Sequence, residues 1–583
     1  MNNAEIARSL ERLADLSELD GDNPFRVRAY RNAAETIRSL GSQLSELLAT
    51  GADLTKIKGI GKEIAEKCRV MVETGSLPQL LDLAERLPVG LLELVKIKGV
   101  GPKQASALWH ELAISTVDEL EAAAIDGRLE ALKGFGRKTS ENLIRGIESY
   151  RRNLGRTPIG MVDATIAPLM QGLKTIEGLK RLEVAGSYRR RRDSIGDIDI
   201  VASATNPELV ARWLTSFQEV AATLGSGTTK TSVELFNGLQ VDLRMVEERS
   251  FGAALLYFTG SKEHGVALRQ RALDRGWHLN EYGLFEGGEP GRDRLGGKLL
   301  AGEDEAGIYR RLGLQYIVPE LRENRGEIEA AAVDSLPTLV EQSDVRGDMH
   351  MHSTWSDGKH SLTEMVDACA DLGYEYLAIT DHSASLVVQG GLDEAKLARQ
   401  HQELDEITVD GRRRGLAVLR GMEVDILKDG SLDLSDAWLD RLDIVLVSVH
   451  SFFELDKEEQ TARVIKAVSH PAVNVLAHPT GRLLGRRDPT SLDFNRVFEA
   501  CASNNVAVEH NASAKRLDLS DVLLRDAVAS GLKVFIDSDA HTITGLAAMS
   551  LGVQQARRAW LTRDDIVNCW DLGAMTAFLA KSR

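Results

Sequence analysis

The pattern of hydrophobic and polar residues divides the chain into a helical first part and two later parts that contain strands. Apolar residues recur at helical spacing across 5–19 and 25–40, and residues 81–155 continue this pattern. Short runs rich in β-branched residues begin at residue 181 and predict strands. From residue 345 onward such runs alternate with helical segments, which predicts parallel βα units and a barrel.

Composition indicates a globular protein of several domains. The chain is 43% hydrophobic and 27% charged, which is typical of globular proteins. Its 583 residues are too many for a single hydrophobic core. No apolar run approaches the roughly 20 residues of a membrane span, and the first residues do not resemble a signal peptide. Four widely spaced cysteines favour reduced thiols. We therefore expect a cytoplasmic, nucleoid-associated monomer with no membrane partner.

Three aspartates carry the first candidate chemistry. Asp197 and Asp199 are two positions apart beside the predicted strand 198–203, so their carboxylates leave the same face of a sheet. Asp242 lies in another predicted strand, 239–246, whose alternation places it beside the pair. Three such carboxylates hold two cations, Mg²⁺ or Mn²⁺, about 4 Å apart, which suits in-line attack of an oxygen on a phosphate. The alternative is that the acids merely occupy a solvated strand face.

The residues just before this pair fit a triphosphate. Gly186 and Ser187 lie at the end of the predicted strand 181–188 and would contribute backbone and hydroxyl donors to phosphate oxygens, with Arg190 balancing charge. The formal net charge of −16 predicts local phosphate contacts rather than a broad cationic groove, and the arginine run 189–192 is a candidate basic patch.

These motifs resemble the palm of the family X DNA polymerases, relatives of DNA polymerase beta. The resemblance rests on Gly186-Ser187, Arg190, Gly196-Asp197-Ile198-Asp199, Val241-Asp242-Leu243-Arg244 and Tyr257-Phe258-Thr259-Gly260-Ser261. It implies that Tyr257, Phe258 and Gly260 belong to a wall that excludes a ribose 2′-hydroxyl. It also implies that Arg269 lies near the templating base. Gly265 stands where many members have a base-contacting Asn, and Lys262 where the beta enzyme has an Asp. At these two positions the chain lacks the side chains with which the family checks the base pair, so the resemblance does not imply that check here.

A Lys-Gly-apolar-Gly sequence occurs three times in the helical part, starting at residues 58, 98 and 133. A glycine turn that opens a helix presents free amide groups and a positive dipole end, which suits a DNA phosphate. The turns resemble helix-hairpin-helix motifs, which grip the DNA backbone without reading sequence. One such turn is equally well a helix boundary, but three favour DNA binding. The candidate DNA-binding residues are Gly59, Gly61, Gly99, Gly101, Gly134 and Gly136.

Lys67, on the helix after the first turn, is a candidate catalytic residue. Its spacing is similar to that of the lysine with which beta-like repair enzymes form a Schiff base on an abasic sugar, and Tyr30-Arg31 matches a pair in the same domain. Phe25 and Arg26 replace the His and Lys of lyase-competent members. The alternative is that Lys67 is a solvated charge on a helix surface.

Histidines and acids in the last part of the chain lie at or just past the ends of apolar runs. An α/β barrel gathers its active-site residues there. Mixed imidazole and carboxylate ligands suit Zn²⁺ or Mn²⁺, and a hydroxide between such ions would attack a phosphodiester. The candidate ligands are His350, His352, Asp357, His382, Glu423, His450, His478, Asp539 and His541.

This set of nine resembles the ligands of the polymerase-and-histidinol-phosphatase (PHP) domain, a distorted (β/α)7 barrel that binds up to three metal ions. The resemblance covers nearly all of 345–583 and implies Zn²⁺ or Mn²⁺, or both, and a Mn²⁺-dependent 3′→5′ exonuclease, with cleavage at abasic sites in some relatives. Glu509, Asn511 and Arg482 are expected near the same rim. Some relatives have lost ligands and keep the domain for structure only, whereas all nine are present here.

Together the resemblances imply a multidomain α/β protein with helical helix-hairpin-helix domains, a nucleotidyltransferase palm with a mixed sheet, a small α/β thumb and a PHP barrel. The expected function is template-directed short-gap filling in DNA repair, with gapped or primer-template DNA and deoxynucleoside triphosphates as substrates. Two alternatives are a nucleotidyltransferase acting on RNA or a small molecule, and a DNA-binding scaffold with a structural PHP domain. The expected segments are 1–80 (lyase-like helices), 81–155 (further DNA-binding helices), 156–250 (palm), 251–320 (nucleotide-binding subdomain), 321–344 (linker) and 345–583 (PHP domain).

Overall fold

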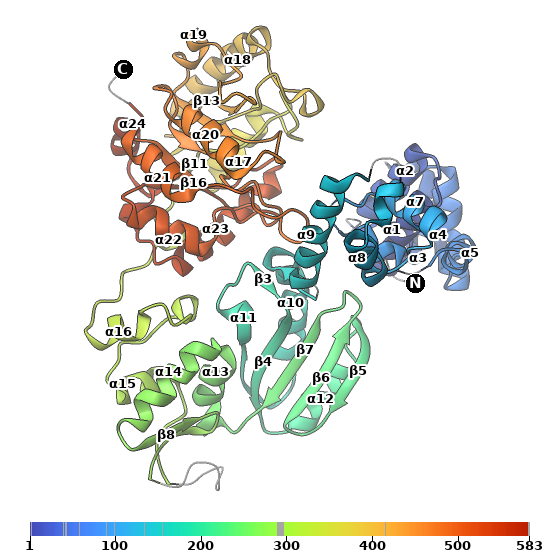
Figure 1. Ribbon diagram of the computed structural model, residues 1–583. Helices are drawn as coiled ribbons and strands as arrows, with labels where there is room; N and C mark the ends of the chain where they lie inside the picture. Colours follow the sequence, from blue (N-terminus) through green and yellow to red (C-terminus); the bar gives the residue numbers. More distant parts are fainter. Residues whose placement is uncertain are drawn as a thin grey trace. The chain divides into compact units, whose positions relative to one another are not determined.

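The computed structural model describes the chain except for residues 2, 39, 41–42, 58, 89, 98, 133–134, 154, 288–296, 414 and 581–583. The chain forms two compact units, residues 1–154 and 155–583, which are described separately (Figure 1). Among the helices of the described residues, none combines the length and the apolar composition that crossing a bilayer requires.

The described residues of the first unit form helices around one hydrophobic core. The helices predicted at 5–19 and 25–40 are confirmed as α1 and α2, because their apolar positions, among them Leu13 and Tyr30, face this core and are fully buried. The helices are α1 (Asn3–Leu19), α2 (Pro24–Arg38), α3 (Leu44–Ala49), α4 (Lys62–Thr74), α5 (Pro78–Arg86), α6 (Leu91–Leu94), α7 (Pro102–Leu112), α8 (Val117–Ile125) and α9 (Arg137–Asn153).

The palm is a five-stranded mixed sheet in the order β2-β4-β7-β6-β5, in which only β4 and β7 pair in parallel. Along β4, Ile198 and Ile200 are fully buried in the palm core, and Asp197 and Asp199, which alternate with them, therefore leave the opposite face. The strands are β2 (Leu179–Val184), β4 (Asp197–Ala204), β5 (Val220–Ser226), β6 (Lys230–Leu235) and β7 (Gln240–Met245), and the helices α10 (Ile159–Lys174) and α12 (Pro207–Thr215) contribute to the same core.

The strand predicted at 181–188 is wrong in its second half. Strand β2 ends at Val184, and residues Gly186–Arg189 form the short helix α11. The backbone turns here because Gly186 adopts a φ of +64°, and a Cβ atom on it would lie 2.5 Å from the Asp199 carboxylate. The sequence pattern showed the apolar residues of the run 181–188, but it did not show that Gly186 lies against the Asp199 carboxylate.

The subdomain after the palm contains helices and a three-stranded antiparallel sheet in the order β10-β9-β8. Its elements are α13 (Phe251–Thr259), α14 (Lys262–Leu273), β8 (Trp277–Asn280), β9 (Gly283–Glu286), β10 (Lys298–Ala301) and α15 (Glu305–Arg311). Residues 321–344, where we expect a linker, contain α16 (Glu327–Ala332) and fully buried charges at Arg322 and Glu327. Glu327 lies 2.7 Å from the His264 ring, so this polar segment is packed against the subdomain by paired side chains.

The last part of the chain is a seven-stranded parallel sheet whose strands follow one another in sequence order. A bridge between Met351 and Ala540, just past the first and last strands, nearly closes it, which confirms the (β/α)7 barrel. The strands are β11 (Gly347–Asp348), β12 (Tyr376–Ile379), β13 (Ala417–Asp425), β14 (Ile444–Ser448), β15 (Val475–Leu476), β16 (Ala507–Asn511) and β17 (Val534–Asp537). The helices include α17 (Leu362–Asp371), α18 (Glu394–Arg413), α20 (Lys457–Val468), α21 (Phe494–Ser503), α22 (Asp521–Ala529), α23 (Met549–Arg558) and α24 (Leu572–Leu579).

Candidate active sites

The structure brings the three palm acids together on neighbouring strands. Asp199 on β4 lies directly opposite Asp242 on β7, and Asp197 precedes Asp199 by two residues on the same strand. Burial, followed by the charges of Asp197 and Asp242, raises the pKa of Asp199 to about 7. Mutually repelling carboxylates of this kind are the electrostatic signature of a cation site.

Asp242 is held by protein donors. Lys230 lies 2.8 Å from one of its oxygens, and the Gln240 amide donates to the other over 2.9 Å. Burial raises the pKa of Asp242, but the hydrogen bonds from Lys230, Ser232 and Gln240 outweigh burial, so this pKa is lowered. Lys230 and Gln240 were missed in the sequence, because neither belongs to the recognised motif.

The predicted nucleotide-binding residues line one cavity of about 580 Å³ beside these acids. The ring of Phe258 packs edge-on against that of Tyr257, and Gly260 approaches the Arg190 guanidinium so closely that a Cβ atom would lie 3.1 Å from it. A Cβ atom on Gly265 would meet no atom within 4 Å, so the cavity is open where many relatives have an asparagine. The lining includes Gly186, Ser187, Arg190, Asp197, Asp199, Tyr257, Phe258, Gly260, Lys262, Gly265 and Arg269, together with Arg156 and Asn280, which the sequence did not single out.

The raised pKa of Asp199 predicts a pH-dependent metal requirement. A proton and a metal ion compete for the same carboxylate, so the Mg²⁺ concentration for half-maximal nucleotide incorporation should rise as the pH falls through about 7. We expect an increase of roughly tenfold between about pH 7.5 and about pH 6. Mg²⁺ titrations at several pH values measure it, and a half-maximal concentration that stays constant over this range contradicts the assignment.

The arginine run 189–192 does not form a free basic patch. Arg189 pairs with Glu305 at 2.8 Å, and Arg190 pairs with Glu323 at 3.1 Å. Arg192 lies 3.8 Å from the same Glu323. These arginines therefore face protein carboxylates, which neutralise much of the charge of the run. Its contact with DNA stays a prediction.

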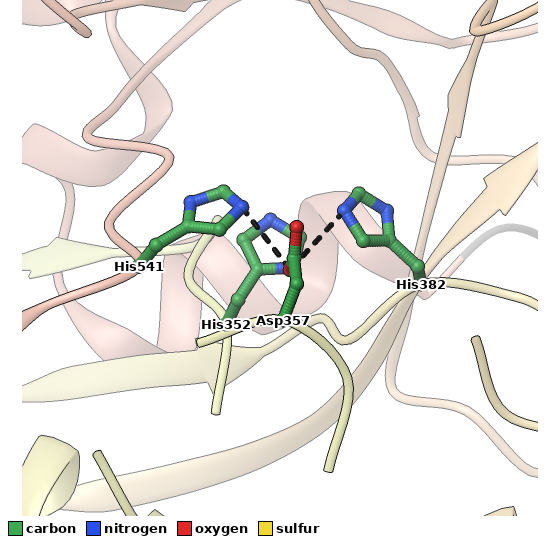
Figure 2. A group of neighbouring side chains, drawn as sticks. All are labelled: His352, Asp357, His382 and His541. Carbon is green, nitrogen blue, oxygen red and sulfur yellow. Dashed lines mark ion pairs between the residues drawn. The ribbon is translucent and has the colours of Figure 1, made fainter. Parts of the chain in front are cut away.

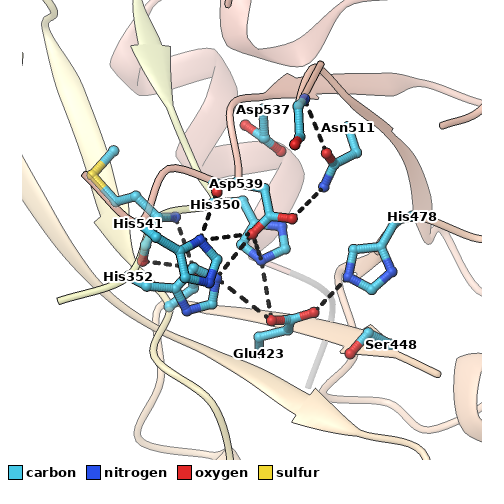
Figure 3. A network of polar contacts seen from close by, with 12 residues as sticks. His350, His352, Glu423, Ser448, His478, Asn511, Asp537, Asp539 and His541 are labelled. Atoms are coloured by element: carbon cyan, nitrogen blue, oxygen red, sulfur yellow. Dashed lines mark hydrogen bonds and ion pairs between the residues drawn. The ribbon is translucent and has the colours of Figure 1, made fainter. Parts of the chain in front are cut away.

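The nine candidate ligands of the barrel converge at the carboxyl ends of its strands. Figure 2 shows Asp357 between His382 and His541, with ion-pair distances of 3.6 and 3.2 Å. Three overlapping groups of ligand atoms are close enough to hold a metal ion each: His352, Asp357, His382 and His541; His350, His352 and Glu423; and His382, Glu423 and His450. His478 lies 2.8 Å from Glu423, and Asp539 lies 3.2 Å from His352 (Figure 3).

The donor atoms of this centre fit bound cations. Nε2 of His350 and Oε2 of Glu423 are buried 3.3 Å apart, yet neither makes a hydrogen bond. Burial raises the pKa of Glu423, but the surrounding histidines outweigh it and hold this pKa well below its ordinary value. Buried, unbonded nitrogen and oxygen atoms that face one another are what Zn²⁺ or Mn²⁺ ligation requires.

A second layer of side chains orients the ligands. Glu509 is fully buried, lies 2.5 Å from Nδ1 of His350 and accepts the backbone N–H of His478 over 2.6 Å. Asn511 donates to Asp539 over 3.1 Å (Figure 3). Such partners fix the ring orientation of metal-bound histidines.

Two arginines lie close to the barrel centre. Arg516, which the sequence did not single out, has its Nε 3.4 Å from the Asp539 carboxylate. Arg482, which we expected near the rim, donates from Nε to the carbonyl oxygen of Arg516 over 2.9 Å and pairs with Asp193 of the palm at 3.1 Å. The sequence pattern could not predict either ion pair, because the two partners of each pair are far apart in the chain.

The glycine turns of the first unit have the expected backbone. Gly59 and Gly99 both adopt a φ of +93°, and Gly61 and Gly101 are the N-caps of α4 and α7. Gly136 directly precedes α9, whereas Gly134 lies outside the described residues. Their role in DNA binding stays a prediction.

Lys67 projects from α4 into a polar neighbourhood. Its Nζ lies 2.5 Å from the side-chain oxygen of Gln79, 3.5 Å from Glu63 and 5.7 Å from the centre of the Tyr30 ring. The side chain is only 15% exposed, so it is not the fully solvated charge of the alternative interpretation. Its role as a Schiff-base nucleophile stays a prediction.

Comparisons with known proteins agree with these features. Residues 1–77 match the helix-hairpin-helix domain, and residues 91–149 match the SAM-like helix-hairpin-helix tandem. Residues 254–323 match the DNA polymerase beta thumb, and residues 348–512 match the PHP domain.

Relatives resemble either the whole chain or one part of it. The chain is 36% identical to the DNA polymerase/3′-5′ exonuclease PolX of Bacillus subtilis (strain 168) over 586 aligned residues, 100% of both proteins. It is 26% identical to DNA polymerase lambda of Rattus norvegicus over 352 residues, 55% of this chain and 56% of that protein. It is also 26% identical to a probable phosphatase of Thermoanaerobacter sp. (strain X514) over 247 residues, 40% of this chain and 95% of that protein.

The fold and the two centres define a multidomain protein in which helix-hairpin-helix domains, a polymerase palm and a thumb are joined to a PHP barrel. The B. subtilis relative aligns with the whole of this chain. The chain belongs to the family X DNA polymerases with a C-terminal PHP domain.

Proposed function

We propose that the chain fills short gaps in DNA during repair, by template-directed transfer of nucleotides from deoxynucleoside triphosphates to a primer 3′ end. The observation that carries this proposal is the triad Asp197, Asp199 and Asp242 beside a cavity lined by Ser187 and Arg190. It is supported by the B. subtilis relative, whose name gives both polymerase and exonuclease.

The palm residues have separable tasks in this reaction. Asp197, Asp199 and Asp242 would hold two Mg²⁺ or Mn²⁺ ions, which neutralise phosphate charge and favour ionisation of the primer hydroxyl. Ser187 and Arg190 would bind the triphosphate, and the Tyr257–Phe258 wall would leave no room for a ribose 2′-hydroxyl. The glycine turns of the first unit would bind DNA phosphates without reading sequence.

The barrel would supply a Mn²⁺-dependent 3′→5′ exonuclease on the same DNA. All nine candidate ligands are present, and several of their buried atoms, among them Nε2 of His350 and Oε2 of Glu423, lack the hydrogen bonds that a purely structural cluster would form. The nine candidate ligands would hold up to three Zn²⁺ or Mn²⁺ ions, and these would supply Lewis acidity for the hydrolysis of a phosphodiester. Cleavage at abasic sites would follow from the same phosphodiester hydrolysis.

Both reactions use DNA as substrate, so the protein would act at the nucleoid.

A gapped-duplex assay tests the polymerase proposal against its alternatives. Wild type should extend the primer with deoxynucleotides in preference to ribonucleotides, and Asp242→Ala should lose extension by roughly a thousandfold because one metal ligand is missing. A clear preference for ribonucleotides favours the RNA nucleotidyltransferase instead. Failure of wild type to extend or digest any DNA with Mg²⁺ or Mn²⁺ favours the scaffold.

A further inference from the structure

The palm and the barrel share packed side chains where α10 meets the barrel loops. A Cβ atom on Gly160, in the first turn of α10, would lie 2.5 Å from the Cβ of Ala514, so a glycine is needed for this approach. Leu517 and Leu551 of the barrel are buried in the same hydrophobic cluster as Ile159. The palm core therefore continues into the barrel at this point.

Two barrel side chains hold the backbone of the palm segment 189–193, here called the arginine loop. Nη1 of Arg558 donates a hydrogen bond to the carbonyl oxygen of Arg190. Nε2 of Gln555 donates to the carbonyl oxygen of Arg191 over 2.6 Å. Both donors come from α23 and are only 2% exposed, so water competes little for these carbonyls.

The same network holds the side chain of Arg190. Its Nε lies 3.1 Å from Glu323, and its Nη1 donates to the carbonyl oxygen of Thr259. Glu323 also lies 3.1 Å from Nη2 of Arg558, which in turn lies 2.7 Å from Asp521. Each buried arginine thus has a carboxylate partner, which buried charges require. Arg558 contacts both the backbone of Arg190 and the carboxylate that orients its guanidinium.

We propose that the barrel positions the nucleotide-binding loop of the palm, with Arg558 as the positioning residue. This inference rests on the proposed polymerase function, because Arg190 lines the cavity in which the triphosphate would bind. Without Arg558, the Arg190 carbonyl loses its buried donor and Glu323 loses one of its two closest cations. The loop would then adopt other orientations, and a guanidinium that is not pre-oriented binds phosphate more weakly. The barrel would thus serve nucleotide binding as well as its own metal chemistry.

The test compares the full-length wild type with the full-length Arg558→Ala variant in steady-state incorporation on gapped DNA. We expect the KM for the deoxynucleoside triphosphate to rise about tenfold while kcat falls less. The reason is that the triphosphate would lose about the strength of one hydrogen bond from a pre-oriented Arg190. The Mn²⁺-dependent digestion of a 3′ end by the same preparation should stay within about twofold, because Arg558 touches none of the barrel ligands. Arg558→Lys should restore part of the loss, since one ammonium reaches fewer partners than a guanidinium.

Arg557 provides a matched control on the same helix. It pairs with Glu320 at 2.8 Å and Glu341 at 2.7 Å and does not contact the arginine loop. Arg557→Ala should therefore leave the KM for the nucleotide unchanged even where it lowers the melting temperature. If Arg558→Ala does not fold, Gln555→Leu removes the contact to Arg191 alone and should raise the same KM.

The outcomes separate this inference from the proposed function. A wild type that incorporates no deoxynucleotide overturns the polymerase proposal itself. A wild type that incorporates normally, with the KM for the nucleotide unchanged in Arg558→Ala or raised equally in Arg557→Ala, overturns only the positioning role of Arg558. A fall of both activities in proportion to lost folded protein likewise shows a purely structural role.

Discussion

Asp199→Asn is expected to lower kcat for nucleotide incorporation by about three orders of magnitude or more, the size of effect that follows loss of a metal ligand between two cations. Asp199 is flanked by Asp197 and opposed by Asp242, and a neutral amide there removes the charge that a cation must find. Single-turnover extension of a gapped duplex with saturating Mg²⁺ measures the effect. Exonuclease activity of the same protein should be unchanged, because the barrel ligands are untouched.

Glu208 provides the control for this substitution. It is an exposed carboxylate in the first turn of α12, in the same palm, and it does not line the nucleotide cavity. Glu208→Gln should change kcat by less than about threefold. Retention of incorporation within about tenfold of wild type in Asp199→Asn would mean that the triad does not hold the reactive metal ions.

The reciprocal variant sharpens the comparison. Asp539→Asn should abolish 3′-end digestion and leave incorporation intact, since Asp539 lies among the barrel histidines and the palm acids are unaffected. The structure therefore predicts that each reaction can be removed without the other. That independence concerns chemistry only, because Arg558 joins the barrel to the nucleotide loop by direct contact.

The sequence was informative wherever function depends on residues close together in the chain or at repeated structural positions. Asp197 and Asp199 were placed on one face by the strand period, and the barrel histidines by their position after apolar runs. The convergence of all nine candidate ligands follows from parallel strands whose carboxyl ends meet on one side of a barrel.

The sequence was uninformative where long-range contacts decide the structure. Gly186 has to be a glycine because it lies close to Asp199, which comes 13 residues later in the chain. The packed segment 321–344 resembles a linker in sequence because its buried residues include charges such as Arg322 and Glu327. Arg558 and Glu323 are far apart in the chain, so periodicity has no means of pairing them. Hydrophobic pattern reports which face is buried, but it does not report which buried charges meet.

Glu423→Gln is expected to deplete the barrel of metal, because one carboxylate faces five histidines. Its oxygens lie 2.8 Å from His382 and His478, 3.3 Å from His350 and His450, and 3.6 Å from His352. A neutral amide cannot balance two neighbouring cations and presents N–H groups to nitrogen ligands, so metal affinity should fall by at least about a hundredfold. Metal content by mass spectrometry should drop, and Mn²⁺-dependent digestion should fall about a thousandfold.

Glu375→Gln is the matched control for Glu423→Gln, since Glu375 is a half-exposed carboxylate of the same barrel whose partner is Arg346 at 2.9 Å. It should keep both metal and nuclease activity. Incorporation by Glu423→Gln should persist, because the α23 contacts to the arginine loop do not pass through the metal ligands. If Glu423→Gln retains its full metal content, Glu423 does not bridge the ions. If it loses metal and incorporation together while remaining folded, the ions stabilise the barrel face that holds the palm, and the two centres are coupled more tightly than their contacts indicate.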